Sequence, residues 1–128
     1  EGQSKAYGVD IVIGQSTQSQ IPEYATLFLD NIKVKGKSEA VTIYCLVGAE
    51  DVAESRDFKT LEQFHTQMIE AYLDQDWSKA AKRLKECRML CTPYGIDGFY
   101  DLYESRIIDY QTNNPGIDWD GVFIATSK

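Results

Sequence analysis

Three lysines at alternating positions are the residues of this sequence that could most readily do chemistry. Lys33, Lys35 and Lys37 lie in the run Lys33-Val34-Lys35-Gly36-Lys37-Ser38. Successive side chains on a strand point to opposite faces, so alternate residues project from one face. A lysine ammonium placed in this way can bind an anionic ligand, above all a phosphate. The alternative is a solvated hairpin tip, because lysines at a strand edge also discourage aggregation.

Two apolar runs flank the lysines and predict the strands of a hairpin. Tyr24–Val34 precedes the turn, and Ala40–Val47 returns antiparallel to it. Gly36 supplies the permissive backbone for the reversal, and Ser38 can form a local hydrogen bond in the turn. In the first strand, Leu27 and Leu29 are expected on one face and Phe28 and Ile32 on the other. Both faces are too apolar for water, so the hairpin needs further strands or a helical layer.

The segment before the hairpin predicts one more strand and a short helix. Val9–Ile13 is almost continuously apolar, which is typical of a strand buried on both faces. Ser16 or Thr17 is expected to cap a helix that reaches about Pro22.

The hydrophobic period changes from two to about 3.6 after Gly48–Asp51, which is a candidate domain boundary. The second part predicts three helices and a short final strand. The helices begin near Asp57, at Trp77 with Asp76 as its cap, and at Asp97, and the strand covers Val122–Ala125. The sequence therefore predicts an α+β fold.

The strand, short helix and hairpin together resemble the closing part of a class III nucleotidyl cyclase catalytic domain. Three stretches carry the resemblance: Tyr7–Thr17, Val34–Val41 with the Val-Lys-Gly-Lys tip, and Ile43-Tyr44. It covers roughly Lys5 to Gly48. The final stretch from Trp119 is also similar to the chain ends of bacterial membrane-anchored adenylate cyclases.

The resemblance implies a role in nucleotide binding for one lysine. In that family the lysine before the tip glycine contacts the triphosphate, so this role carries over to Lys35, with support from Lys33 and Lys37. The parent enzyme would be a lyase that converts ATP to cyclic AMP and pyrophosphate, as a homodimer and with two Mg or Mn ions. The family's metal-binding, base-reading and transition-state residues lie upstream of the matched part, so no catalytic or metal-binding residue is assigned here.

On this interpretation the chain is a C-terminal fragment that is inactive by itself. Residues 1–50 form the end of a ferredoxin-like cyclase domain, and residues 51–128 form a three-helix extension. ATP and GTP cannot be distinguished, because the base-reading residues lie upstream.

The alternative is a non-catalytic regulatory or protein-interaction module that works through residues 52–128. The stretch from Ala71 to Ala80 resembles the helical hairpin of a tetratricopeptide repeat. Only about one unit is present, whereas such arrays need about three to bury a continuous core. A helical hairpin packed on its own domain, or on a protein partner, explains the same pattern.

Composition limits the partners. The net charge of −7 argues against nucleic acid, whose phosphates attract basic surfaces. No apolar run approaches the roughly 18 residues that span a membrane, so a cytoplasmic location is expected, with any inner-membrane anchor of the parent further upstream. Cys45, Cys87, Cys91 and His65 have no metal-ligand spacing and are interpreted as packing residues.

Overall fold

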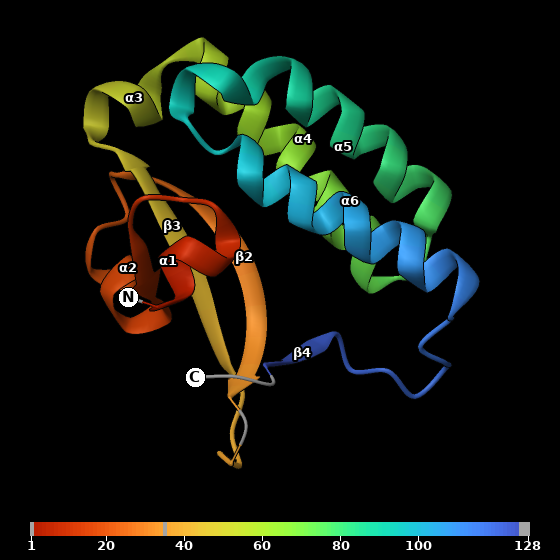
Figure 1. Cartoon of the computed structure of the whole chain (residues 1–128). Coiled ribbons are helices and arrows are strands. Elements are labelled where there is room, and N and C mark those ends of the chain that lie inside the picture. The colour runs from red at the N-terminus through yellow and green to blue at the C-terminus, as the bar shows by residue number, and fades with distance from the viewer. Residues whose placement is uncertain (1, 35, 126–128) are drawn as a thin grey trace.

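The computed structural model describes residues 2–34 and 36–125 and confirms an α+β fold (Figure 1). The first part contains α1 (Gly2–Tyr7), β1 (Val12–Gly14), α2 (Gln15–Gln20), β2 (Ala25–Val34) and β3 (Val41–Gly48). The second part contains α3 (Glu50–Glu54), α4 (Arg56–Leu73), α5 (Trp77–Cys91), the 3-10 turn η1 (Thr92–Tyr94), α6 (Asp97–Thr112) and β4 (Val122–Ala125). Within these described ranges, no helix is both long and apolar enough to cross a membrane.

The strands of the described residues form one mixed sheet in the order β1-β3-β2-β4. The predicted hairpin is confirmed, because β2 and β3 pair antiparallel. The final strand is also confirmed. It pairs parallel to the end of β2, from Asn31 opposite Val122 to Val34 opposite Ala125. The strand that leads into the lysine tip therefore has a neighbour on each side.

A bulge in β2 overturns the predicted faces of that strand. Phe28 pairs with Tyr44 and Asp30 with Ile43, so Leu29 is an extra residue opposite β3. The inward–outward alternation shifts by one position there. Ile32 is therefore buried, as Leu27 and Leu29 are, while Phe28 is only half-buried. The same shift turns Asp30 into the protein interior, where it is 1% exposed.

Two further expectations for the N-terminal segment are wrong. The strand β1 covers only residues 12–14, which are half-buried or exposed, so it is not buried on both faces. Ile11, expected inside, is largely exposed. The helix α2 begins two or three residues earlier than expected, after Gly14, and it has no side-chain cap from Ser16 or Thr17.

The predicted helices of the second part are confirmed, with caps that explain where they begin. The Ser55 hydroxyl accepts a hydrogen bond from the Phe58 amide at the start of α4. Asp76, the expected cap of α5, accepts one from the Lys79 amide at 3.2 Å. Gly95, with φ of 69°, ends η1 in a left-handed conformation and allows the chain to turn into α6.

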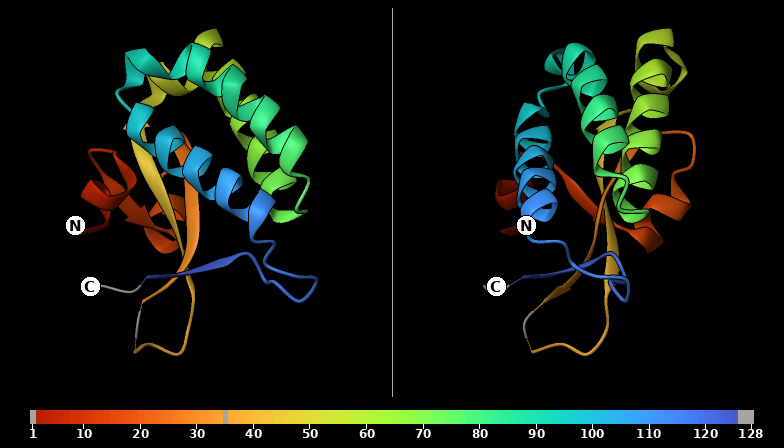
Figure 2. Two further views of the ribbon diagram at one scale, coloured as in Figure 1. Left: turned by 45° about the vertical axis from the view of Figure 1, so that its right-hand side comes forward. Right: turned by 90° about the vertical axis from the view of Figure 1, so that its right-hand side faces the viewer.

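The helices α4 and α6 lie on opposite sides of β2, and α5 packs on both from outside (Figure 2). Buried side chains of the sheet and of the helices belong to one hydrophobic core. Trp119 packs on the helices, with its ring 5.3 Å from that of Tyr72 and 5.4 Å from that of Tyr110. The division into a cyclase part and a helical extension stays a prediction.

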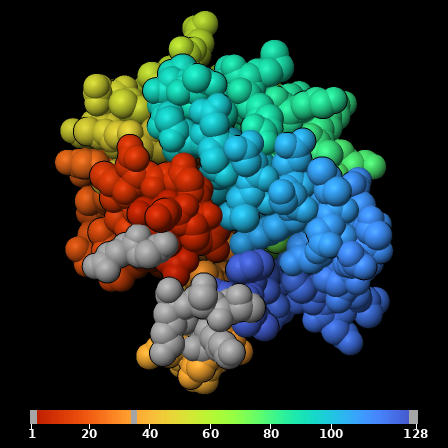
Figure 3. Space-filling model, in the orientation of Figure 1, coloured from red at the N-terminus to blue at the C-terminus, as the bar shows by residue number. Residues whose placement is uncertain are grey.

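Two glycines allow α1 to lie directly against α6 (Figure 3). A Cβ on Gly8 would lie 2.7 Å from backbone atoms of Gly98, and Gly8 has a φ of 67°. We therefore expect Gly8→Ala to lower the free energy of unfolding by about 2 kcal/mol, through backbone strain and the forced separation of the helices. Urea titration followed by tryptophan fluorescence measures this loss.

Gly95→Ala is the matched control for that variant. Gly95 has a φ of 69°, but no atom lies within 4 Å of its added Cβ. Only the backbone strain remains, so its loss should be about 1 kcal/mol. Equal losses for the two variants would show that the close approach of α1 and α6 contributes nothing.

Candidate functional site

The lysine run lies at the connection between β2 and β3, and Lys33 and Lys37 are among its described residues. Gly36 has a φ of 89°, so it makes the reversal that the sequence predicts. Lys33 is half-buried within β2, and Lys37 is exposed beyond the turn. Lys35, the predicted phosphate ligand, lies outside the described residues, so its role and the shared face of the three lysines stay predictions.

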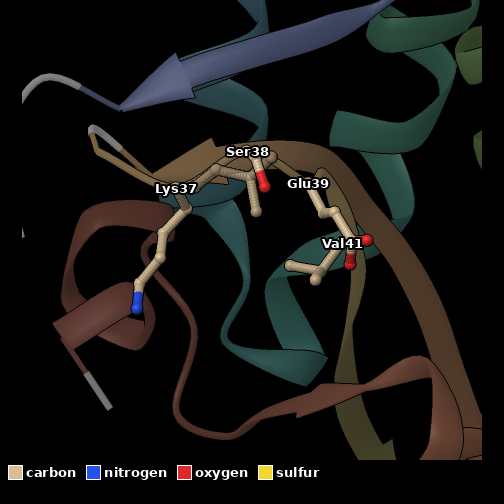
Figure 4. A pocket seen from close by; sticks show the side chains of 5 residues that line it. Lys37, Ser38, Glu39 and Val41 are labelled. Carbon is tan, nitrogen blue, oxygen red and sulfur yellow. The ribbon is translucent and has the colours of Figure 1, made fainter.

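A shallow hollow of about 390 Å³ lies beside the tip. Its lining includes Lys37, Ser38, Glu39 and Val41, which Figure 4 shows, together with Ile32. The side chains of Lys37 and Glu39 point in different directions in this view. The Lys37 ammonium would attract an anion, and the Glu39 carboxylate would oppose it. The lining of the hollow therefore has one charge of each sign.

Behind the tip, Asp30 and Arg106 form a buried ion pair between β2 and α6. Arg106 Nη2 donates to Asp30 Oδ2 at 2.8 Å, and the side chains are 7% and 1% exposed. The Tyr7 hydroxyl of α1 donates to the same carboxylate oxygen at 2.5 Å. The Tyr103 hydroxyl donates to the carbonyl of Leu29 at 2.6 Å, which satisfies the backbone at the bulge.

Burial and the ion pair shift the pKa values of Tyr7 and Arg106. Burial raises the pKa of Tyr7 well above its usual value, and the Asp30 carboxylate raises it further. Burial acts to lower the pKa of Arg106, but the adjacent Asp30 carboxylate outweighs it and raises that pKa. The tyrosine therefore stays neutral and the arginine charged at physiological pH. Neither Tyr7 nor Arg106 is poised to exchange a proton at this pH, and their bonds to Asp30 hold α1, β2 and α6 together.

A second buried polar group joins α4, α6 and the bulged strand. His65 Nε2 lies 2.7 Å from the carbonyl oxygen of Phe28, and His65 Nδ1 lies 2.8 Å from the Tyr100 hydroxyl. A carbonyl oxygen only accepts, so Nε2 carries the proton, and Nδ1 accepts from Tyr100. Burial lowers the pKa of His65 to about 4, which keeps the ring neutral. The interpretation of His65 as a packing residue is confirmed, with these two hydrogen bonds added.

The three cysteines are buried and free within the described residues. Burial raises the pKa of Cys45 and Cys87 to about 12 and that of Cys91 to about 11. Thiols with such pKa values are protonated and poorly nucleophilic at neutral pH. They pack as the sequence predicts. Among the described residues, no three or more histidine, cysteine or acidic side chains come together in a way that could hold a metal ion.

Sequence reasoning missed the Asp30–Arg106 cluster, although both residues left a signal. Asp30 interrupts an apolar strand, and Arg106 lies three residues after Tyr103 on the predicted apolar side of its helix. A charged residue at each of two core positions predicts a buried pair. Asp30 points inward because of the bulge, and no residue type in the strand predicts a bulge at this position.

Comparisons with protein families, with curated proteins and with solved structures find no match for this chain.

Proposed function

We propose that this chain is the C-terminal part of a class III adenylate cyclase and that Lys35 contacts the triphosphate of ATP. The observation that carries the proposal is the hairpin β2–β3, whose turn falls at the Val-Lys-Gly-Lys sequence with Gly36 in a left-handed conformation. The order β1, α2, β2, β3 also agrees with the order that the resemblance implies. The parent would convert ATP to cyclic AMP and pyrophosphate.

The role proposed for this chain is confined to the phosphates. When pyrophosphate leaves, negative charge builds up on the departing oxygens, and a cation placed beside them lowers the barrier. Lys35 would supply this cation, and Lys37, exposed on the hollow, adds positive potential without direct contact. The resemblance places the residues that would hold the parent's two metal ions upstream of the matched part.

Tripolyphosphate, the inorganic counterpart of the ATP phosphates, tests the site in the 128-residue chain. We expect it to shift the amide resonances of Gly36, Lys37 and Ser38, and we expect Lys35→Ala to weaken its binding by about 10-fold, the value of one charge-assisted hydrogen bond. Lys59→Ala, which removes an exposed lysine from α4, is the control and should leave the affinity unchanged. Equal affinities for both variants would overturn the assignment of Lys35.

A second candidate is the interaction module within residues 52–128. In its favour, Met89 of α5 and Ile108 of α6 are 83% and 59% exposed, and a groove of about 110 Å³ lies between these helices. Against it, the buried side chains of these helices belong to the same hydrophobic core as those of the sheet. The cyclase proposal is preferred because its lysine motif lies at the turn of the β2–β3 hairpin.

A further inference from the structure

The strand that carries the lysine tip is held in place from the far end of the sequence. Residues 31–34 of β2 pair with residues 122–125 of β4, and Lys33 lies directly opposite Ile124. On its other side β2 pairs with β3 only as far as Ile32, opposite Val41. The last two residues before Lys35 therefore have β4 as their neighbouring strand.

Arg106 links this strand pair to the helical layer. Its guanidinium donates to Asp30, the residue just before the paired segment, and its carbon Cζ lies 3.9 Å from the centre of the Phe123 ring. Arg106 thus contacts β2 through an ion pair and β4 through a cation–π interaction, which is favourable at this range. Its Nη1 also donates to the Tyr72 hydroxyl of α4 at 3.4 Å, and its Cζ lies 5.0 Å from the centre of the Tyr103 ring, so contacts from the sheet and from the helices orient it together.

We infer that β4 and Arg106 together position the lysine tip, with Arg106 acting as a positioning residue for phosphate binding. The choice of phosphate as the ligand rests on the proposed function. The ordering of the end of β2 by β4 and Arg106 does not depend on it. A tip at the end of an unsupported two-stranded ribbon would sample many orientations, and an ordered lysine binds an anion more tightly because less conformational freedom is lost. The helical layer can therefore affect nucleotide affinity without touching the nucleotide.

Ile124→Pro separates β4 from β2 with little damage to the core. The Ile124 side chain is 60% exposed, and proline removes a backbone donor and bends the strand. Ile124→Ala is the matched control, because it removes the same exposed side chain and keeps the backbone donor. Amide hydrogen exchange in the 128-residue chain should become at least about 10-fold faster at residues 31–34 in the proline variant alone. Exchange at Cys45 and Leu61, both buried in the core, should stay unchanged.

Phe123→Leu tests Arg106 without removing its partner Asp30. Leucine keeps an apolar side chain in β4 but offers no ring for the guanidinium. We expect amide exchange to become faster at residues 31–34 here too, by a smaller factor than in Ile124→Pro. The exchange rate at Cys45 should not change. If the variant only lowered the global free energy of unfolding, amide exchange in the core would become faster as well.

Tripolyphosphate titration of the same samples separates this inference from the proposed function. Affinity about 3-fold weaker in Ile124→Pro than in Ile124→Ala supports a positioning role. Faster exchange with equal affinities would overturn it, and so would equal exchange in the two variants. If the unmodified chain gave no resonance shift with tripolyphosphate, the proposed function would fail, and the exchange data would still decide whether β4 and Arg106 order the strand.

Discussion

Replacing Arg106 by alanine is expected to lower the free energy of unfolding by about 3–5 kcal/mol, the typical loss when one partner of a buried ion pair is removed. The carboxylate of Asp30, 1% exposed, would then be left in the core with the Tyr7 hydroxyl as its remaining strong donor. A buried charge without a compensating cation is far less stable than the same charge in water. Urea unfolding, followed by the fluorescence of Trp77 and Trp119, measures the loss.

Arg88→Ala is the matched control, since it also removes an arginine from an ion-paired position. Arg88 contacts Asp101 and Glu104 at 2.6 and 2.9 Å, but those carboxylates are 68% and 52% exposed. Water screens such pairs, and we expect a loss of at most about 1 kcal/mol. Similar losses for Arg88→Ala and Arg106→Ala would contradict the importance assigned to burial.

A second variant identifies the cause of the loss. If the uncompensated charge of Asp30 is responsible, Asp30→Asn added to Arg106→Ala should recover about 1 kcal/mol or more, because the amide is neutral. If the loss came only from the cavity left by the arginine side chain, Asp30→Asn would recover nothing. The sign of this change therefore decides between electrostatics and packing.

The parts of the fold that the sequence predicts are those in which local pattern and tertiary packing agree. The helices α4, α5 and α6 carry apolar stripes with clear ends, such as the Asp76 cap and the turn at Gly95, and all three form as expected. The hairpin β2–β3 is predicted for the same reason, since both strands are long and apolar and Gly36 lies between them.

The parts that could not be predicted depend on contacts between distant residues. Val9–Ile13 looks like a central strand, but the ladder with β3 begins at Val12, and the amide of the buried Val9 donates to the Ser4 carbonyl of α1. The bulge at Leu29 is stabilised from outside the strand, by the Tyr103 hydroxyl on the Leu29 carbonyl and by His65 on that of Phe28. Both donors come from helices that follow in the sequence, so the strand alone carries no sign of them.

The candidate site also has a part that the sequence predicts and a part that it does not. The lysines and Gly36 are adjacent in the sequence, so a motif can reveal them. The support behind them is not adjacent, because Asp30, Arg106 and Phe123 come from β2, α6 and β4. Sequence reasoning therefore found the residues proposed to touch phosphate and missed those inferred to orient them.

Acid is expected to destabilise this protein through His65, the only histidine in the sequence. Burial lowers the pKa of His65 from 6.5 to about 4 in the folded state. The stabilising effect of the neutral ring is thus complete above pH 6.5 and is lost as pH falls toward 4, because the unfolded chain takes up the proton first. One pKa unit corresponds to about 1.4 kcal/mol, so the total loss from this residue is about 3 kcal/mol.

His65→Gln isolates that contribution from the titration of carboxylates. Glutamine offers one donor for the Phe28 carbonyl and one acceptor for the Tyr100 hydroxyl, but it does not titrate. The variant should be less stable at pH 7, and its free energy of unfolding should fall less steeply than that of the unmodified chain between pH 6.5 and 4. Parallel pH profiles would contradict a lowered pKa for His65, and a proton NMR titration of the ring with a midpoint near 6.5 would contradict it directly. Protonation adds a proton at Nδ1, so it removes the hydrogen bond that Nδ1 accepts from Tyr100, while Nε2 still donates to the Phe28 carbonyl beside the bulge.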